Sequence, residues 1–214
     1  MSSLSGSYIL EVYNSRNTLL ELLKHEEYDV SDYMNFSVNE INTMYSNNQL
    51  DMLVERQSDG SKVYVKHMLN NNNKQIRKEN LDELVEDLFV IENVLTNKEK
   101  DTIIVIAEDE PNDTITTKMK YLYDHDGIFV VIHNIKRLQF NILKHTLVPH
   151  ISILNEDDLN KLKVEKNFDK LNLLPEISRF DPQALAVCLR PKQVCKLIRK
   201  SVTAVDTTYY RVCV

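Results

Sequence analysis

The sequence is poor in glycine, and this scarcity excludes whole classes of nucleotide-binding protein. Its 214 residues contain only Gly6, Gly60 and Gly127. Phosphate-binding loops and dinucleotide fingerprints need several glycines within a few residues, because the backbone must approach the phosphates closely. The chain has no such motif. We therefore expect neither a cofactor nor a small-molecule substrate.

Cysteine and long apolar runs are also scarce. The cysteines are odd in number and form no CxxC pair, so the sequence predicts buried thiols rather than a disulfide framework or a zinc site; they are Cys188, Cys195 and Cys213. The longest apolar runs, Ile103–Ala107 and Ile128–Ile132, are far too short to cross a membrane. The N-terminus MSSLSGSY lacks the apolar core of a signal peptide. We expect an intracellular protein with no membrane partner.

The residues that are present have the composition of a folded globular protein, 43% hydrophobic and 27% charged. The net charge of −6 is unevenly distributed. Residues 141–214 carry 12 Lys and Arg against 8 Asp and Glu, a net +4, which leaves 14 against 24, a net −10, for residues 1–140. Neither part has the low hydrophobicity of a disordered tail. We therefore predict two domains, 1–140 and 141–214.

Residues 1–140 are predicted to form an α/β domain. Apolar residues at helical spacing from Ile9 to Leu23 indicate an amphipathic helix that ends before Tyr28. Segments 50–56 and 62–69 flank a Ser-Asp-Gly-Ser turn, which indicates a β-hairpin, and a polar loop follows from Asn70.

Two apolar strands within 101–109 and 127–134 bracket a helical stretch over 113–123. This order predicts a crossover unit whose sheet is covered on both faces. Before it, Asn80 is expected to cap a helix, whose apolar face comprises Leu81, Leu84, Val85, Leu88 and Leu95. Residues 124–126, directly before Gly127, are expected to form a turn.

Residues 141–214 are predicted to form a small α+β domain. Asn155 is expected to cap a helix with an acidic first turn, and Asp181 a short helix that begins with Pro182 and stops before Pro191. Residues 194–200 are predicted to form a strand. In DTTYYRVCV at the C-terminus, alternate residues share a face, which indicates a second strand. These two strands are expected to pair as a terminal hairpin.

A search for catalytic or metal-binding residues gives one pattern to test, that of a metal-dependent nuclease. Such nucleases hold the metal with two carboxylates, the second of which lies two residues before a lysine. Asp51 and Lys66 fit, but Tyr64 stands where the second carboxylate is required, and Glu55 is followed two residues later by Gln57. His145 and His150 lack partnering cysteines and are expected to be packing or turn residues. The sequence therefore predicts no catalytic residue and no metal site.

The C-terminal part contains a series of short motifs in a characteristic order. They are HxLVP at His145–Pro149, LPEI at Leu174–Ile177, DPxA at Asp181–Ala184, QVxKxIR at Gln193–Arg199, SxTA at Ser201–Ala204, and Tyr210-Arg211. Their order and spacing resemble the fifth subunit of eukaryotic RNA polymerases, whose C-terminal assembly domain is shared with a small subunit of the archaeal enzymes. The resemblance is strong over roughly the last 75 residues. Over the N-terminal part it is weaker and rests mainly on the order of the predicted elements.

The resemblance implies a non-catalytic polymerase subunit with an assembly domain and a jaw domain. The assembly domain would dock on the largest subunit, and the jaw, with a nuclease-like but inactive fold, would lie near downstream DNA with Pro111 closest to it. Three carboxylates beside that proline, Glu108, Asp109 and Glu110, are expected to repel phosphate. The residues implied for the subunit interface are His145, Leu147, Val148, Pro149, Pro175, Asp181, Pro182, Arg190, Gln193, Val194, Arg199, Ser201, Thr203, Ala204, Tyr210 and Arg211.

The chain departs from the family pattern at several positions. The family usually has glycine where Cys188, Lys192 and Val205 stand, proline at Lys200 and glutamate at Val202. Because valine disfavours positive φ, we expect the turn over 201–206 to differ from the cellular one. This divergence and the asparagine run favour a homologue from a large DNA virus, which would be found in the virion and host cytoplasm. A cellular protein would be nuclear.

The C-terminal part is rich in cations although the whole chain is acidic. These cations are Arg190, Lys192, Lys196, Arg199 and Lys200, and they lie within predicted structure rather than in a tail. We interpret them as partly solvated charge and partly a docking surface for an acidic segment of the largest subunit, in which Arg199 can make bidentate contacts. The alternative is a merely solvated face. The alternative interpretation of the function is a freestanding nucleic-acid-processing protein with a nuclease-like domain.

Overall fold

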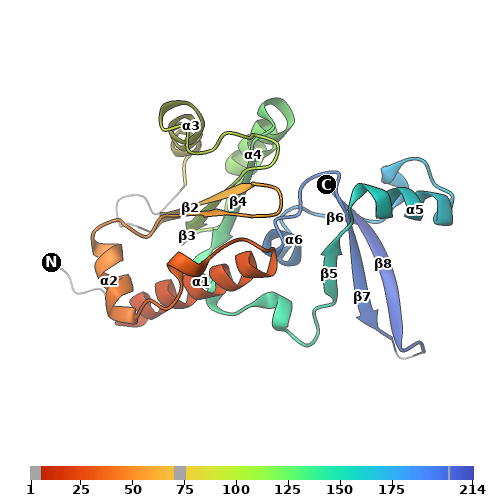
Figure 1. Cartoon of the computed structure of the whole chain (residues 1–214), viewed down its shortest axis with the longest axis horizontal. Helices are drawn as coiled ribbons and strands as arrows, with labels where there is room; N and C mark the ends of the chain where they lie inside the picture. The colour runs from red at the N-terminus through yellow and green to blue at the C-terminus, as the bar shows by residue number, and fades with distance from the viewer. Residues whose placement is uncertain (1–5, 70–75, 202) are drawn as a thin grey trace. The chain divides into compact units, whose positions relative to one another are not determined.

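A computed structural model describes residues 6–69, 76–201 and 203–214. The chain forms two compact units, Met1–Phe140 and Asn141–Val214, and each is described by itself (Figure 1). The predicted loop from Asn70 and the departure at Val202 lie outside the described residues. Within the described residues, no helix combines the length and the apolar character that crossing a bilayer requires.

The N-terminal unit is built on a four-stranded sheet in the order β1-β2-β3-β4. Strands β1 (Met52–Glu55) and β2 (Lys62–Met68) are antiparallel, whereas β2, β3 (Thr102–Ala107) and β4 (Phe129–Asn134) are parallel. The predicted hairpin is confirmed, and Gly60 supplies the positive φ of its turn. The predicted crossover unit is confirmed as well, because helix α4 (Asp113–Asp126) connects the parallel strands β3 and β4.

Helices cover both faces of this sheet, as predicted. Helices α1 (Gly6–His25) and α2 (Val38–Ser46) lie on one side of the strands, and α3 (Lys78–Glu86) and α4 lie on the other (Figure 1). Every residue of β3 and β4 is buried as a result. Short helices complete the unit: η1 (Ser31–Tyr33), the π-helix η2 (Asp87–Ile91) that continues α3, and η3 (Ile135–Gln139).

Three local predictions in this unit were wrong or incomplete. Asn80 does not cap a helix: α3 begins at Lys78, so Asn80 lies inside it, and the preceding Arg77 gives no side-chain cap; Leu95, predicted on the apolar face of the same helix, lies beyond its end. Residues 124–126 do not form a turn but complete α4, which ends on Gly127 in the left-handed conformation. Helix α2 was not predicted.

The C-terminal unit contains a second four-stranded sheet, in the order β5-β7-β8-β6. The predicted hairpin is confirmed as antiparallel β7 (Val194–Lys200) and β8 (Asp206–Cys213). The edge strands β5 (His150–Ile153) and β6 (Glu176–Ile177) were not predicted. Helix α5 (Glu156–Lys166) is capped by Asn155, and α6 (Pro182–Ala186) by Asp181, as predicted. Two short helices, η4 (Ile142–Lys144) and η5 (Leu171–Leu173), lie in the connections.

Two apolar clusters lie on opposite faces of this sheet. Neighbouring residues of a strand point to opposite faces, and accordingly Val194 packs with Leu162 of α5 while Cys195 packs with Ala184 of α6. Cys195 and Cys213 are buried in the cluster on the α6 side, and Cys188 is half-buried; all three are free thiols, as predicted. The unit thus has hydrophobic packing of its own on both faces.

The backbone is left-handed at two of the three positions where the resemblance implies glycine. Cys188 has φ +49° and Lys192 has φ +70°, both in the connection between α6 and β7. Such values are unfavourable for residues with a Cβ atom. Val205, the third such position, is not among the positive-φ residues of the described chain. A turn over 201–206 that differs from the cellular one stays a prediction.

Candidate functional site

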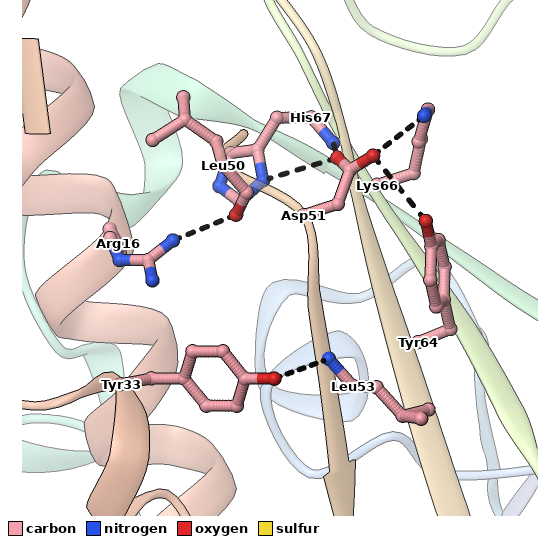
Figure 2. A network of polar contacts seen from close by, with 8 residues as sticks. All are labelled: Arg16, Tyr33, Leu50, Asp51, Leu53, Tyr64, Lys66 and His67. Carbon is pink, nitrogen blue, oxygen red and sulfur yellow. Dashed lines mark hydrogen bonds and ion pairs between the residues drawn. The ribbon is translucent and has the colours of Figure 1, made fainter. Parts of the chain in front are cut away.

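Asp51 is the centre of a polar cluster on the N-terminal sheet. Its Oδ2 atom lies 2.6 Å from Lys66 Nζ and accepts a hydrogen bond from the Tyr64 hydroxyl at 3.4 Å. Its Oδ1 atom accepts the backbone N–H of His67 at 3.0 Å. The hairpin produces this convergence, because Tyr64 and Lys66 are two residues apart on β2 and Asp51 directly precedes the paired strand β1 (Figure 2).

The donors around Asp51 do not suit a catalytic metal ion. Burial and the neighbouring Asp51 carboxylate raise the pKa of the Tyr64 phenol, so this side chain is a neutral donor rather than an anionic ligand. The Lys66 ammonium already neutralises Asp51, and a metal would have to displace it. No group of three His, Cys, Asp or Glu side chains with metal-binding geometry occurs in 6–69, 76–201 or 203–214. The nuclease pattern tested in the sequence thus identified three residues, Asp51, Tyr64 and Lys66, that lie together in the structure.

Two buried basic side chains beside this cluster were missed by the sequence analysis. Arg16 is 1% exposed; its Nη1 donates to the Leu50 carbonyl at 2.8 Å, while its Nε and Nη2 have no hydrogen-bond partner. Its guanidinium also lies within 6 Å of the Tyr33 and Phe36 rings. Helical spacing was the available signal, because Arg16 follows Val12 by one turn on the apolar face.

His67 is the second of these side chains. Both ring nitrogens are buried without a hydrogen-bond partner. Burial, together with the positive charges of Arg16 and Lys66, lowers the pKa of His67 to about 3. The Asp51 carboxylate is 3.9 Å from Nδ1, but Lys66 already neutralises it. His67 is therefore a neutral packing residue at physiological pH.

A pocket of about 310 Å³ opens beside Asp51. The sheet contributes Asp51, Lys66 and His67 to its wall, and α3 and η2 contribute Asn80, Glu83 and Asp87. Three carboxylates against a single ammonium make this wall unfavourable for a phosphate group. The pocket beside Asp51 therefore lacks the charge to bind a nucleic-acid backbone.

The loop after β3 carries the three carboxylates that were expected to repel phosphate, Glu108, Asp109 and Glu110. Glu108 accepts a hydrogen bond from the Tyr8 hydroxyl at 2.7 Å, and Glu110 Oε1 lies 2.7 Å from Arg137 Nη2 and 3.0 Å from its Nε. Arg137 thus offsets the charge of Glu110, whereas the Tyr8 hydroxyl brings no charge to Glu108, so the expected repulsion of phosphate stays a prediction. Pro111 follows them and is half-buried.

In the C-terminal unit, the residues implied for a subunit interface fall into two groups. The first group presents exposed side chains: His145, Leu147, Pro175, Pro182, Arg199, Thr203, Ala204 and Arg211. Leu147 is 85% exposed, which is unusual for a leucine. Exposed side chains of this kind are available to a partner.

The second group is at least partly used within the fold: Val148, Pro149, Asp181, Arg190, Gln193, Val194, Ser201 and Tyr210. Asp181 caps α6, Gln193 Oε1 accepts the Arg190 backbone N–H, and Ser201 Oγ accepts those of Thr203 and Ala204. Val194 is 2% exposed and belongs to the core. Its side chain is therefore inaccessible to a partner.

Several cations on β7 lack a carboxylate partner. Lys196, Arg199 and Lys200 form no ion pair with any of the described residues, although each is at least partly exposed. Arg211, on β8, donates from Nη1 to the Glu176 carbonyl at 3.3 Å. These four residues, which we call the hairpin cations, are spread along the β7–β8 hairpin.

Comparisons with known proteins agree with the motifs of this unit. The family model of the RNA polymerase Rpb5 C-terminal domain matches residues 140–213. DNA-directed RNA polymerase subunit Rpo5 of Methanococcoides burtonii is 41% identical over 73 residues, which are 34% of this chain and 92% of that protein. The Rpo5 subunits of Thermococcus kodakarensis and Pyrococcus abyssi are 38% and 41% identical over 76 residues, 36% of this chain and 92% of each relative.

These similarities cover nearly the whole length of the archaeal proteins and coincide with the C-terminal unit of this one. The motifs and the extent of the match point to one relationship. The chain belongs to the Rpb5 family of DNA-directed RNA polymerase subunits.

Proposed function

We propose that this protein is a non-catalytic structural subunit of a multisubunit DNA-directed RNA polymerase and that its C-terminal unit docks on the largest subunit. The observation that carries the proposal is that this one unit corresponds to almost the entire length of archaeal Rpo5. The features that this unit shares with those small subunits are therefore sufficient for assembly into a polymerase. No residue of the proposal acts on a substrate.

The hairpin cations define the chemistry of the docking contact. Arg199 lies opposite Thr207 in the β7–β8 ladder, and its guanidinium has no ion pair among the described residues. A planar guanidinium can hold a carboxylate through two parallel hydrogen bonds, which an ammonium cannot. We propose that Arg199 and its neighbours bind a carboxylate-rich segment of the largest subunit.

The N-terminal unit is proposed to be the jaw of this subunit, near downstream DNA. Its mixed sheet and the meeting of Asp51, Tyr64 and Lys66 support a nuclease-like fold without the nuclease chemistry. Its net charge of −10 and acidic pocket wall disfavour tight contact with phosphate. Proximity of Pro111 to DNA would therefore be set by assembly rather than by independent DNA binding.

The second candidate, a freestanding nucleic-acid-processing protein, depends on the same sheet. It requires a metal site at Asp51, whereas Lys66 holds that carboxylate at 2.6 Å and Tyr64 replaces the second ligand. An origin in a large DNA virus, and with it a virion or host-cytoplasm location, stays a prediction.

Reversal of one docking charge tests the proposal. The variant Arg199→Glu should lose about 2–5 kcal/mol of association free energy, because it places like charges together at a desolvated contact. The measurement is recovery of the polymerase with the tagged full-length protein from its native cell. Lys170→Glu, an equal charge reversal on an exposed residue of the same unit, should be recovered like the wild type.

Circular dichroism of each variant first establishes that it is folded. A folded Arg199→Glu protein that assembles normally would remove Arg199 from the contact. Wild-type protein that brings down no large polymerase subunits, or that cleaves DNA with Mg²⁺ in a manner abolished by Asp51→Ala, would favour the freestanding enzyme instead.

A further inference from the structure

We infer that the outer edge of β8, from Asp206 to Arg211, is a docking edge to which an extended acidic segment of a polymerase partner adds as a further strand. The inference rests on the proposed function and specifies how the C-terminal unit would dock. It follows from the pairing of the sheet, the direction of the backbone groups, and the charges along the hairpin.

One side of this segment is paired and the other is open. Strand β7 pairs with β8 without interruption from Val194↔Val212 to Lys200↔Asp206. On the other side, β6 pairs only with Val212 and Cys213. No other strand of the described chain adjoins β8. The six residues 206–211 therefore form an edge of the sheet.

The hydrogen bonds of the last residues show which backbone groups face outward. The Cys213 N–H donates to Gln193 on the β7 side, whereas the Val212 N–H donates to Pro175 on the β6 side. Because backbone groups alternate along a strand, the N–H and C=O groups of Thr208 and Tyr210 also face the β6 side. These groups have no hydrogen-bond partner within the described residues.

Pro175 explains why β6 ends where it does. In a parallel pair, the next bond along the edge would run from the N–H of residue 175 to the Tyr210 carbonyl. Proline has no N–H, so the ladder stops and the edge beyond it stays open. An added strand would find the groups of Tyr210 and Thr208 available for hydrogen bonds.

The open edge lacks the features that usually protect such edges. Natural edge strands are commonly blocked by proline, a bulge or a covering segment, because a bare edge pairs with other chains. Residues 206–211 contain no proline or glycine, and their pairing with β7 has no bulge. Thr207, Thr208, Tyr209 and Tyr210 favour extended structure, and Tyr209 is 46% exposed.

Charge complementarity identifies an acidic occupant. The hairpin carries four cations and a single carboxylate: Arg211 and Asp206 lie on β8 itself, and Lys196, Arg199 and Lys200 lie on the neighbouring strand β7. Thr207, Tyr209 and Arg211 alternate onto one face of β8. A strand added beside them would meet an apolar ring and a guanidinium on that face, so it should carry an apolar residue beside Tyr209 and a carboxylate beside Arg211.

Hydrogen exchange of the wild-type protein tests the inference directly. The amides of Thr208 and Tyr210 should exchange freely in the isolated chain and about a hundredfold more slowly in assembled polymerase, because strand addition buries and bonds them. If the protein assembles and both amides still exchange at the free rate, the inference is overturned while the proposed function stands. If wild-type protein recovers no polymerase, both fail.

Two pairs of variants test the geometry and the charge. Thr208→Pro removes an outward N–H that β7 does not use, so it should lower recovery of polymerase about tenfold or more, whereas Thr208→Ala should not. Arg211→Glu should lower recovery similarly, and Arg211→Lys should retain most of it. Normal recovery of polymerase with folded Arg211→Glu would overturn the inference that the partner segment is acidic. Amide protection that appears in the isolated chain as its concentration rises would overturn it in favour of a second copy of this chain.

Discussion

The imidazole of His67 has a measurable consequence for stability. An unfolded histidine takes up a proton near pH 6.5, whereas burial and the charges of Arg16 and Lys66 hold the folded pKa at about 3. Between these values the unfolded state binds the extra proton. The contribution of His67 to stability is therefore complete above pH 6.5 and declines as the pH falls toward 3, by up to about 1.4 kcal/mol per pH unit.

We predict that His67→Leu will flatten the pH dependence of unfolding between pH 6 and 5 by up to about 1.4 kcal/mol per pH unit, the contribution of one proton. The comparison variant is His133→Leu, because burial and the charge of Arg137 lower the pKa of His133 to about 4. This variant should flatten the pH dependence of unfolding to a similar extent. Urea unfolding of the N-terminal unit at several pH values measures both slopes. An unaltered slope in His67→Leu would show that the folded protein protonates this imidazole easily.

Residues of the Asp51 cluster differ in how readily sequence could identify them. Asp51, Tyr64 and Lys66 could be predicted because a strand repeats every two residues and the hairpin turn fixes which strands meet. The burial of Arg16 was less evident, since a basic side chain on an apolar helix face can also extend to solvent. The pairing of Glu110 with Arg137 could not be predicted, because 27 residues and a whole helix separate them.

At the scale of elements, predictions were correct where a periodic pattern and a cap coincided. Helices α5 and α6 have Asn155 and Asp181 at their starts, and both were placed correctly. Helix α2 was missed although it carries both signals, a capping box of Ser37 and Glu40 and apolar residues at helical spacing, among them Ile41 and Tyr45. Strands β5 and β6 are four and two residues long, too short to show alternation, and become strands only by pairing with the hairpin.

The connection between α6 and β7 yields a prediction about stability. Lys192 is exposed and has φ +70°, a conformation that costs a residue with a Cβ atom roughly 1–2 kcal/mol. Glycine removes that cost but adds about 0.4–1 kcal/mol of freedom to the unfolded chain. We therefore expect Lys192→Gly to stabilise the C-terminal unit by about 0.5–1 kcal/mol.

Lys192→Ala is the matched control, because it removes the same charge and side chain but keeps the Cβ atom. It should show no comparable gain in urea unfolding. A glycine variant less stable than the alanine variant would mean that the left-handed backbone here carries no strain, and that the loss of the family glycine had no energetic consequence.

At the scale of the whole molecule, the charge division at Asn141 coincides with the boundary between the compact units. Composition locates such a boundary because two units that meet different neighbours acquire different surfaces. It does not establish that each unit folds without the other. That depends on whether the hydrophobic packing inside each unit is sufficient.

The last prediction is that residues 141–214 fold alone. The sheet of this unit is covered on both faces by its own clusters, one including Ala184 and the other Leu162. Small domains of this size are marginal, but many fold when the sheet is sandwiched in this way. The excised fragment should therefore unfold in urea in a single cooperative transition, and limited proteolysis of the full chain should release it near Asn141.

Two substitutions on α5 distinguish a packed fragment from a collapsed one. Leu162 is 3% exposed and Val164 is 83% exposed on the same helix. In a packed fragment, Leu162→Ala should cost about 2–5 kcal/mol, whereas Val164→Ala should change stability by less than about 0.5 kcal/mol. If the fragment unfolds gradually, or if the two variants behave alike while the full chain unfolds cooperatively, the C-terminal unit depends on the N-terminal one and the two-domain division is wrong.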